Sequence, residues 1–179
     1  MLSNSFFYGS QQLTVQSALL LAAGRLRGVL DEAATRRVRQ SQEQVQAIVA
    51  EGRTVYGINT GFGILADTPI SEADTRLLQH KILQSHSVGV GDPIPAEIAK
   101  LMLITKVQAL VQGYSGVQLE TLERIIWHID NDVIPVVPEK GSVGASGDLA
   151  PLAHLFLPLI GLGEVYFEGT RRPAGDVLR

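Results

Sequence analysis

Apolar residues recur every three or four positions along most of the chain, and this spacing is typical of amphipathic helices. Most of these periodic segments begin at a Thr, Asp, Ser or Pro, which are residue types that favour a helix N-terminus. The pattern therefore predicts helices over residues 14–22, 31–50, 71–86, 95–113, 119–130 and 148–159.

The remaining segments carry the signals of loops and strands. Residues 53–70 contain three glycines and Pro69, which predicts a loop. The prolines of residues 133–140 favour an extended backbone, and residues 164–172 predict a small β-hairpin that turns at Glu168-Gly169. Because no repeat or flexible linker divides the chain, we expect one mainly α domain, residues 1–179, with a small β-hairpin near its C-terminus.

Composition and charge exclude several classes of function. The 179 residues carry a net charge of −3 and no basic block, which argues against binding to nucleic acid. Because the sequence has no cysteine, disulfides, thiolate zinc sites and cysteine nucleophiles are excluded. His80, His128 and His154 lack metal-ligand spacing, so we interpret them as structural and expect no metal.

The sequence shows no sign of export or of a membrane segment. Its N-terminus lacks a basic stretch followed by an apolar run, and the longest apolar stretch, around residues 155–162, is interrupted by Pro158 and Gly161. We therefore expect a cytoplasmic protein. The mean hydropathy of +0.16 fits either a well-filled core or a surface that is buried against partners or further chain.

The stretch GSVGASGDLAPLAHL, residues 141–155, gathers small residues around Ser146, and this pattern has three interpretations. The simplest is a tight turn, in which Gly144 and Gly147 supply unusual backbone angles and Asp148 caps the following helix. The second is a phosphate-binding loop, although the glycine spacing matches neither the dinucleotide fingerprint nor the P-loop.

The third interpretation is cyclisation of the backbone. If the nitrogen of Gly147 attacks the carbonyl carbon of Ala145, a five-membered ring forms and one water leaves. Loss of a second water from the ring and the Ser146 side chain then leaves an exocyclic methylidene. The reaction requires a small residue on the attacked side, a serine, and a residue without Cβ on the attacking side, and Ala145-Ser146-Gly147 meets all three requirements.

This stretch resembles the signature of the aromatic amino acid ammonia-lyases, enzymes that carry a 4-methylidene-imidazol-5-one (MIO) group. YGINTGFG at residues 56–63 and SHSVGVG at residues 85–91 are similar to two further family motifs in the expected order, and the GYSG run at 113–116 also looks familial. The resemblance covers roughly the whole chain, in the manner of an N-terminal part. It implies the N-terminal domain of the ammonia-lyase (fumarase/aspartase-like) fold and no external cofactor.

The resemblance implies a role for each residue of the signature. Ala145, Ser146 and Gly147 form the MIO electrophile, which captures the α-amine of the substrate and makes it a better leaving group. Asp148 is similar to the family's aspartate that assists cyclisation. At a helix N-terminus, free N–H groups and the helix dipole stabilise negative charge that develops in the ring.

Tyr56 matches the family's catalytic base, which removes a weakly acidic β-proton. A free tyrosine has a pKa of about 10, so its neighbours must activate it, and nearby helix N-termini are a candidate cause. A tyrosine in a loop usually packs on the core, but within YGINTGFG the catalytic role is favoured. We expect Asn59 and Gly63 to shape this loop, and Gly141 and Gly144 to shape the approach to the ring.

Ser85 and His86 bear on the substrate. A histidine at a helix end is usually structural. The family, however, contacts the ring of its substrate near this pair, and histidine-specific members are similar to Ser-His here, whereas tyrosine and phenylalanine lyases show His-Leu and Phe-Leu. The resemblance therefore implies that His86 contacts an imidazole, that L-histidine is the substrate, and that urocanate and ammonia are the products.

The sequence also departs from the family pattern. An Asn-Gly-Thr-Gln run, a second tyrosine, a carboxylate-binding arginine and a glutamate belong to later family segments, including a helical bundle, and have no counterpart here. Family members are homotetramers whose sites combine several subunits, so we expect the chain alone to be inactive. Two alternatives stay open: a non-catalytic module acting in assembly or ligand binding, and an MIO lyase or aminomutase acting on another aromatic amino acid.

Overall fold

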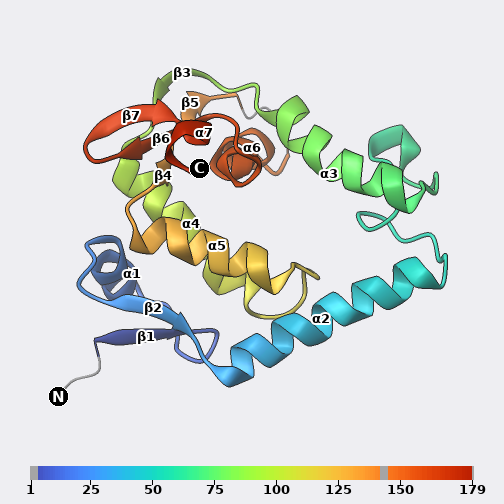
Figure 1. The fold of residues 1–179 in the computed structure, drawn as a ribbon, viewed down its shortest axis with the longest axis horizontal. Helices are drawn as coiled ribbons and strands as arrows, with labels where there is room; N and C mark the ends of the chain where they lie inside the picture. The colour runs from blue at the N-terminus through green and yellow to red at the C-terminus, as the bar shows by residue number, and fades with distance from the viewer. Residues whose placement is uncertain (1–3, 142–144, 179) are drawn as a thin grey trace.

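The computed structural model describes residues 4–141 and 145–178. Its helices and 3-10 turns confirm the prediction of a mainly helical chain. They are α1 (Val15–Ala22), α2 (Glu32–Ala50), η1 (Gly63–Leu65), α3 (Glu72–His86), α4 (Ala96–Leu110), α5 (Leu119–Asp130), α6 (Leu149–Phe156), η2 (Leu157–Ile160) and α7 (Ala174–Val177). In Figure 1, α4 and α5 lie at the centre, while α2 and α3 extend to one side.

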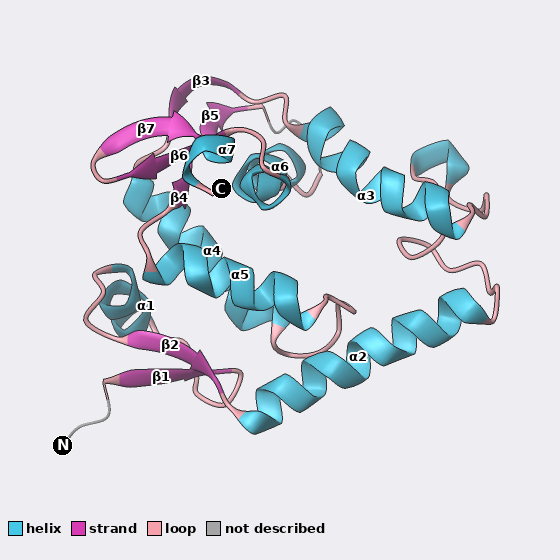
Figure 2. Cartoon of the chain, in the orientation of Figure 1, coloured by secondary structure: helices cyan, strands magenta, loops and turns pink. Residues whose placement is uncertain are grey.

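Short strands lie around this group of helices (Figure 2). They are β1 (Ser5–Tyr8), β2 (Arg27–Leu30), β3 (Val90–Pro93), β4 (Ile134–Pro135), β5 (Pro138–Lys140), β6 (Glu164–Phe167) and β7 (Thr170–Pro173). Among the described residues these strands form three separate sheets. The sheets are the parallel pair β1–β2, the antiparallel pair β3–β5, and an antiparallel sheet in the order β4-β6-β7.

Side chains cap the starts of α2 and α3, as predicted. The Asp31 carboxylate accepts a hydrogen bond from the Ala34 N–H at 2.7 Å, and the Ser71 hydroxyl accepts one from the Asp74 N–H at 3.1 Å. Each bond satisfies a backbone donor that has no acceptor within its own helix. Pro95 precedes α4, where the missing N–H of a proline removes no helical bond.

The predicted hairpin near the C-terminus is confirmed. β6 and β7 pair with Phe167 opposite Thr170, so Glu168 and Gly169 form the two-residue turn. Their φ angles of 50° and 73° are both positive, which is the geometry that matches the right-handed twist of paired strands.

The core lies around α4, which packs against α1, α5 and β4. Ile104 and Val107 of α4 and Leu122 of α5 are fully buried, and they bury enough apolar surface to hold these helices together. Lys100 is buried on the same helix, and its Nζ atom lies 2.5 Å from Oδ1 of Asp132.

The sequence pattern does not predict the pairs β1–β2 and β3–β5. Each strand is at most four residues long, which is too short for a periodic signal, and each pair joins distant segments. The β3–β5 pair has a consequence for function, because it places Val90 opposite Lys140. The end of the SHSVGVG motif therefore lies beside the segment that leads to residues 145–147.

α3 separates the two ends of the candidate site. At its N-terminal end, the loop of residues 53–70 is closed by a hydrogen bond from the Ile70 N–H to the Asn59 carbonyl at 3.0 Å. α3 also packs against α6, and in Figure 1 the contact lies toward its C-terminal end. Fifteen residues at a rise of 1.5 Å each make α3 about 22 Å long.

Within residues 4–141 and 145–178, no helix combines the length and apolar character that a membrane span requires.

Candidate active site

Ala145, Ser146 and Gly147 form an exposed bend directly before α6. Gly147 has a φ of 68°, in the left-handed region that glycine adopts without strain. Among the described residues beyond its two chain neighbours, no atom lies within 4 Å of the position that a Cβ would occupy on Gly147, so the backbone angle is what favours glycine there.

Gly141 is glycine for a different reason. A Cβ on this residue would lie 2.6 Å from the Cα atom of Gly89, which is closer than two such atoms can approach. The predicted role of Gly141, shaping the approach to the bend, therefore has a physical basis in this contact. Gly144, to which we assigned the same role, lies outside the described residues.

Asp148 occupies the N-cap position of α6, but its side chain makes no capping hydrogen bond. The side-chain cap that the tight-turn interpretation predicts is thus not formed. The first-turn N–H groups of any helix lack an intrahelical acceptor, and Pro151 has no N–H to contribute. α6 therefore directs backbone donors and the positive end of its dipole toward the bend.

Two pockets flank Gly147. A pocket of about 430 Å³ lies between Gly89, Gly141, Gly147 and His154. A second pocket, of about 340 Å³, includes Gly147 again together with Asp148. Both volumes are in the range of sites that bind small molecules.

Ser85 and His86 lie in the last turn of α3. Nδ1 of His86 is 3.0 Å from the carbonyl oxygen of Ile82, which only accepts hydrogen bonds, so Nδ1 carries a proton. In the neutral form of the ring Nε2 is the nitrogen with the lone pair, and it makes no hydrogen bond to the residues the structure describes. Oγ of Ser85 lies 3.0 Å from Nδ1 of His86 and helps to fix the orientation of the ring.

The YGINTGFG loop lies before α3. The Tyr56 side chain is 63% exposed, and its ring meets that of Phe62 edge-on at 5.8 Å. Asn59 is buried: its Oδ1 accepts from the Val55 N–H at 2.9 Å, and its Nδ2 donates to the Arg53 carbonyl at 2.7 Å. These are the contacts of a residue that shapes a loop.

Gly63 opens the η1 turn of the same loop with a φ of 60°. A residue with a Cβ adopts this angle only with strain, so Gly63 also acts on the backbone.

The structure brings some of these residues together and keeps others apart. His86 at the end of α3 lies close in sequence to Gly89, which contacts Gly141 and His154 beside the bend. The loop that contains Tyr56 instead leads into the N-terminal end of α3. Between this loop and the segment beside the bend runs α3, which is about 22 Å long.

Sequence reasoning missed the contact between Gly89 and His154. Nε2 of His154 accepts a hydrogen bond from the Gly89 N–H at 2.9 Å. One signal could have found it: His154 follows Gly147 by two helical turns, so it lies on the side of α6 that faces the bend. Burial lowers the pKa of His154, which favours the neutral ring that this hydrogen bond requires.

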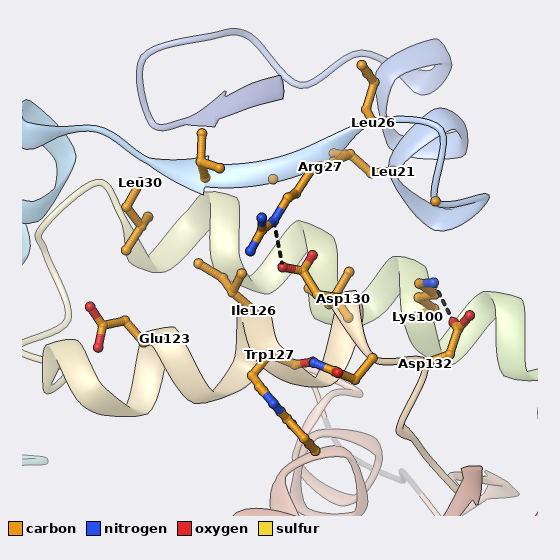
Figure 3. Close-up of a pocket in the computed structure, with 15 residues that line it drawn as sticks. Leu21, Leu26, Arg27, Leu30, Lys100, Glu123, Ile126, Trp127, Asp130 and Asp132 are labelled. Carbon is orange, nitrogen blue, oxygen red and sulfur yellow. Dashed lines mark hydrogen bonds and ion pairs between the residues drawn. The ribbon is translucent and has the colours of Figure 1, made fainter. Parts of the chain in front are cut away.

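A further pocket, of about 710 Å³, lies between β2 and α5 and contains none of the predicted site residues. Figure 3 shows Arg27 reaching Asp130 and Lys100 reaching Asp132 at its edge. Each cation in this pocket is thus paired with a carboxylate. No group of three His, Asp or Glu side chains suited to holding a metal ion occurs in the described ranges.

Comparison with known proteins relates this geometry to a family. The model of the family described as aromatic amino acid lyase matches residues 13–179. The chain is 46% identical to a histidine ammonia-lyase of Caldanaerobacter subterraneus over 93% of its own length and 33% of that protein.

Two solved structures are similar to the whole fold. The crystal structure of histidine ammonia-lyase from Trypanosoma cruzi has a TM-score of 0.88 at 33% identity, covering 98% of this chain and 34% of that one. The tyrosine aminomutase of Streptomyces globisporus has a TM-score of 0.87 at 27% identity, covering 97% of this chain and 32% of that one.

The chain therefore spans about a third of the length of the relatives that it matches. These similarities confirm the predicted ammonia-lyase fold, of which the chain forms an N-terminal part. Because the family model matches all but the first twelve residues, the chain belongs to the aromatic amino acid lyase family.

Proposed function

We propose that the chain is the N-terminal, MIO-bearing part of an enzyme that removes ammonia from L-histidine and releases urocanate. The observation that carries this proposal is the Ala145-Ser146-Gly147 bend, which lies exposed at the N-terminus of α6 in a chain of the aromatic amino acid lyase family. The 46% identity to the Caldanaerobacter histidine ammonia-lyase supports the choice of substrate.

The residues of the bend suit the MIO group. Ala145 is small, Ser146 carries the hydroxyl that leaves as water, and the space around Gly147 is open. The group, once formed, supplies an electrophile for the α-amine of the substrate. The N-terminal end of α6 stabilises negative charge at the bend, and Asp148, whose carboxylate does not cap the helix, is available to accept a proton during cyclisation.

Ser85 and His86 support histidine as the substrate. The lone pair on Nε2 of His86 accepts a hydrogen bond from an imidazole N–H, which a phenyl ring does not offer. Sites that pair with a polar substrate group discriminate strongly against analogues that lack the group.

In this proposal Tyr56 is the base. It removes the β-proton of a substrate that is bound at the bend of another subunit. The tyrosine loop precedes α3, a helix about 22 Å long, and the bend lies toward the other end of that helix, which supports a bend from a different subunit as its partner. In a homotetramer, as the family resemblance implies, the exposed Tyr56 loop of one subunit approaches the bend of the next.

An aminomutase acting on another aromatic amino acid is the second candidate. The likeness to the Streptomyces tyrosine aminomutase favours it, because lyases and aminomutases of this fold share the region that the chain covers. Product analysis separates the two, since a lyase releases ammonia whereas a mutase returns the amine to the β-carbon.

The first experiment is the intact mass of the 179-residue chain, followed by mass mapping of its peptides. A deficit of two waters in the peptide with Ala145-Ser146-Gly147, lost in Ser146→Ala, means that the described fold suffices for cyclisation. An unmodified mass means that any cyclisation requires further chain.

A hybrid enzyme resolves the second outcome. In this hybrid the chain replaces the matching third of the Caldanaerobacter lyase. A two-water deficit together with release of ammonia and urocanate supports the proposal. A correctly folded hybrid without either leaves the non-catalytic module as the better description of the chain.

A further inference from the structure

His154 joins two parts of the candidate site. Its ring extends from α6, which begins just after the Ala145-Ser146-Gly147 bend, and it accepts the hydrogen bond of Gly89 at 2.9 Å. Gly89 follows His86 by three residues. One hydrogen bond thus links α6, the helix that follows the bend, to the segment that follows Ser85-His86.

Gly89 is enclosed at this contact. A Cβ on Gly89 would lie 3.0 Å from Nε2 of His154 and 3.1 Å from the carbonyl oxygen of Lys140. A Cβ on Gly141 would in turn lie 2.6 Å from the Cα atom of Gly89. The backbone of Gly89 therefore packs closely against both the imidazole and the segment that leads into the bend.

The hydrogen bond depends on one form of the ring. A backbone N–H donates only to a lone pair, so Nε2 of His154 is unprotonated and Nδ1 carries the proton. The imidazole also lines the pocket of about 430 Å³ beside Gly147. Its position is thus fixed at the border between the bend and the space available to a small molecule.

We propose that His154 is a positioning residue, which holds the Gly89 backbone and thereby sets the distance between Ser85-His86 and the Ala145-Ser146-Gly147 bend. This inference rests on the proposed function for its catalytic consequence. The hold on Gly89 itself depends only on the contacts within this chain.

Glutamine and methionine at position 154 form a matched pair of variants. Their side chains have nearly the same length, but only glutamine carries an oxygen that can accept a hydrogen bond at the reach of Nε2. His154→Gln should therefore still accept the hydrogen bond from the Gly89 N–H. His154→Met should lose this hydrogen bond while its side chain fills a similar space.

The first readout is hydrogen exchange of the Gly89 amide in the 179-residue chain. Exchange should be slow in the parent and in His154→Gln and fast in His154→Met. Equal exchange in all three proteins would overturn the proposal, whether or not the chain belongs to an active lyase.

The second readout is steady-state kinetics of the hybrid enzyme. His154→Met should raise KM for histidine about tenfold, as expected for the loss of one hydrogen bond, and His154→Gln should restore it to within about twofold. The two-water deficit should be present in both variants. Equal KM and kcat for Gln and Met would show that the acceptor atom has no positioning role.

A parent hybrid without the deficit would count against the proposed function instead, and the exchange of Gly89 would still decide the role of His154.

His128 provides a control. It is a buried histidine of α5 whose Nδ1 bonds the Val133 carbonyl at 2.8 Å, away from both pockets beside Gly147. His128→Gln and His128→Met should change the free energy of unfolding but leave KM and the exchange of Gly89 unaltered.

Discussion

Tyr56 and Ser146 belong to segments at different ends of α3: the tyrosine loop precedes the helix, and the serine precedes α6, which packs toward the C-terminal part of α3. The Asn59–Ile70 hydrogen bond holds the tyrosine loop at the N-terminal end of the helix. The Gly89–His154 hydrogen bond holds the bend's helix at the other end. We therefore propose that a site combining both residues draws them from different subunits.

This arrangement predicts complementation between two inactive variants of the hybrid enzyme. Tyr56→Phe removes the base and Ser146→Ala removes the electrophile, and each alone should lower kcat at least a hundredfold. Coexpression of the two should restore roughly a quarter of the sites, because each site takes one residue from each of two randomly chosen subunits. Mixed assemblies that stay inactive would place both residues in a single chain.

Tyr56→Phe has a second expected result. Because the tyrosine acts after the bend has cyclised, this variant should retain the deficit of two waters that Ser146→Ala loses. Mass spectrometry of the two purified variants measures this difference directly.

Replacing Ser85-His86 with Phe-Leu should move the substrate preference of the hybrid toward phenylalanine. The change removes the Nε2 acceptor of His86 and adds apolar surface, so kcat/KM for histidine relative to phenylalanine should fall on the order of a hundredfold. Gln84→Ala, on the exposed side of the same turn, is the control and should leave the ratio unchanged. An unaltered ratio in the double variant would remove the argument for histidine.

Tyr8→Phe should stabilise the chain. Tyr8 is fully buried, and its hydroxyl has no hydrogen-bond partner among the described residues. Burial, together with the nearby charge of Asp130, raises the pKa of this hydroxyl, so it stays protonated and unsatisfied. Its removal should raise the free energy of unfolding by about 1 kcal/mol in urea titration.

Tyr114→Phe is the matched control for this change. Tyr114 is 92% exposed, so loss of its hydroxyl should have no measurable effect on unfolding. A clear loss of stability in Tyr8→Phe would show that the buried hydroxyl has a partner after all.

Asp31 should contribute to the acid sensitivity of the fold. Hydrogen bonds from the Ser10 hydroxyl and the Ala34 N–H lower the pKa of its carboxyl below the usual value. The contribution is therefore present above the unfolded-state pKa of about 4 and is lost as the pH falls through the lower folded-state value.

Asp31→Asn separates this charge from helix capping. Asparagine also caps helices, so the variant keeps α2 but no longer titrates. The fall in melting temperature below about pH 4 should be shallower than in the parent. Identical acid-side slopes for the two proteins would exclude Asp31 as a source of the pH dependence.

Local chemistry explains what could be predicted from the sequence. Asp31 and Ser71 start their helices through bonds to residues three positions away, and Glu168-Gly169 forms a turn of two residues. Each of these features depends on neighbours in the chain, so a short stretch of sequence contains all the information needed.

Long-range contacts explain what could not be predicted. The pair of Val90 with Lys140 and the bond of Gly89 to His154 join residues 50 and 65 positions apart. No periodic pattern records such a pairing, so His154 appeared to be merely structural. The resemblance named the motif residues, but the separation of Tyr56 from Ser146 required the length and direction of α3.

The strand β7 leaves one edge of the three-stranded sheet open. All four of its residues are exposed, and they include Arg171, Arg172 and Pro173. Charged side chains and proline on an edge strand hinder the addition of a strand from another molecule, since the charged groups would have to leave water and proline lacks a donor. The chain therefore carries its own protection against aggregation at the sheet edge where intermolecular strand pairing would otherwise begin.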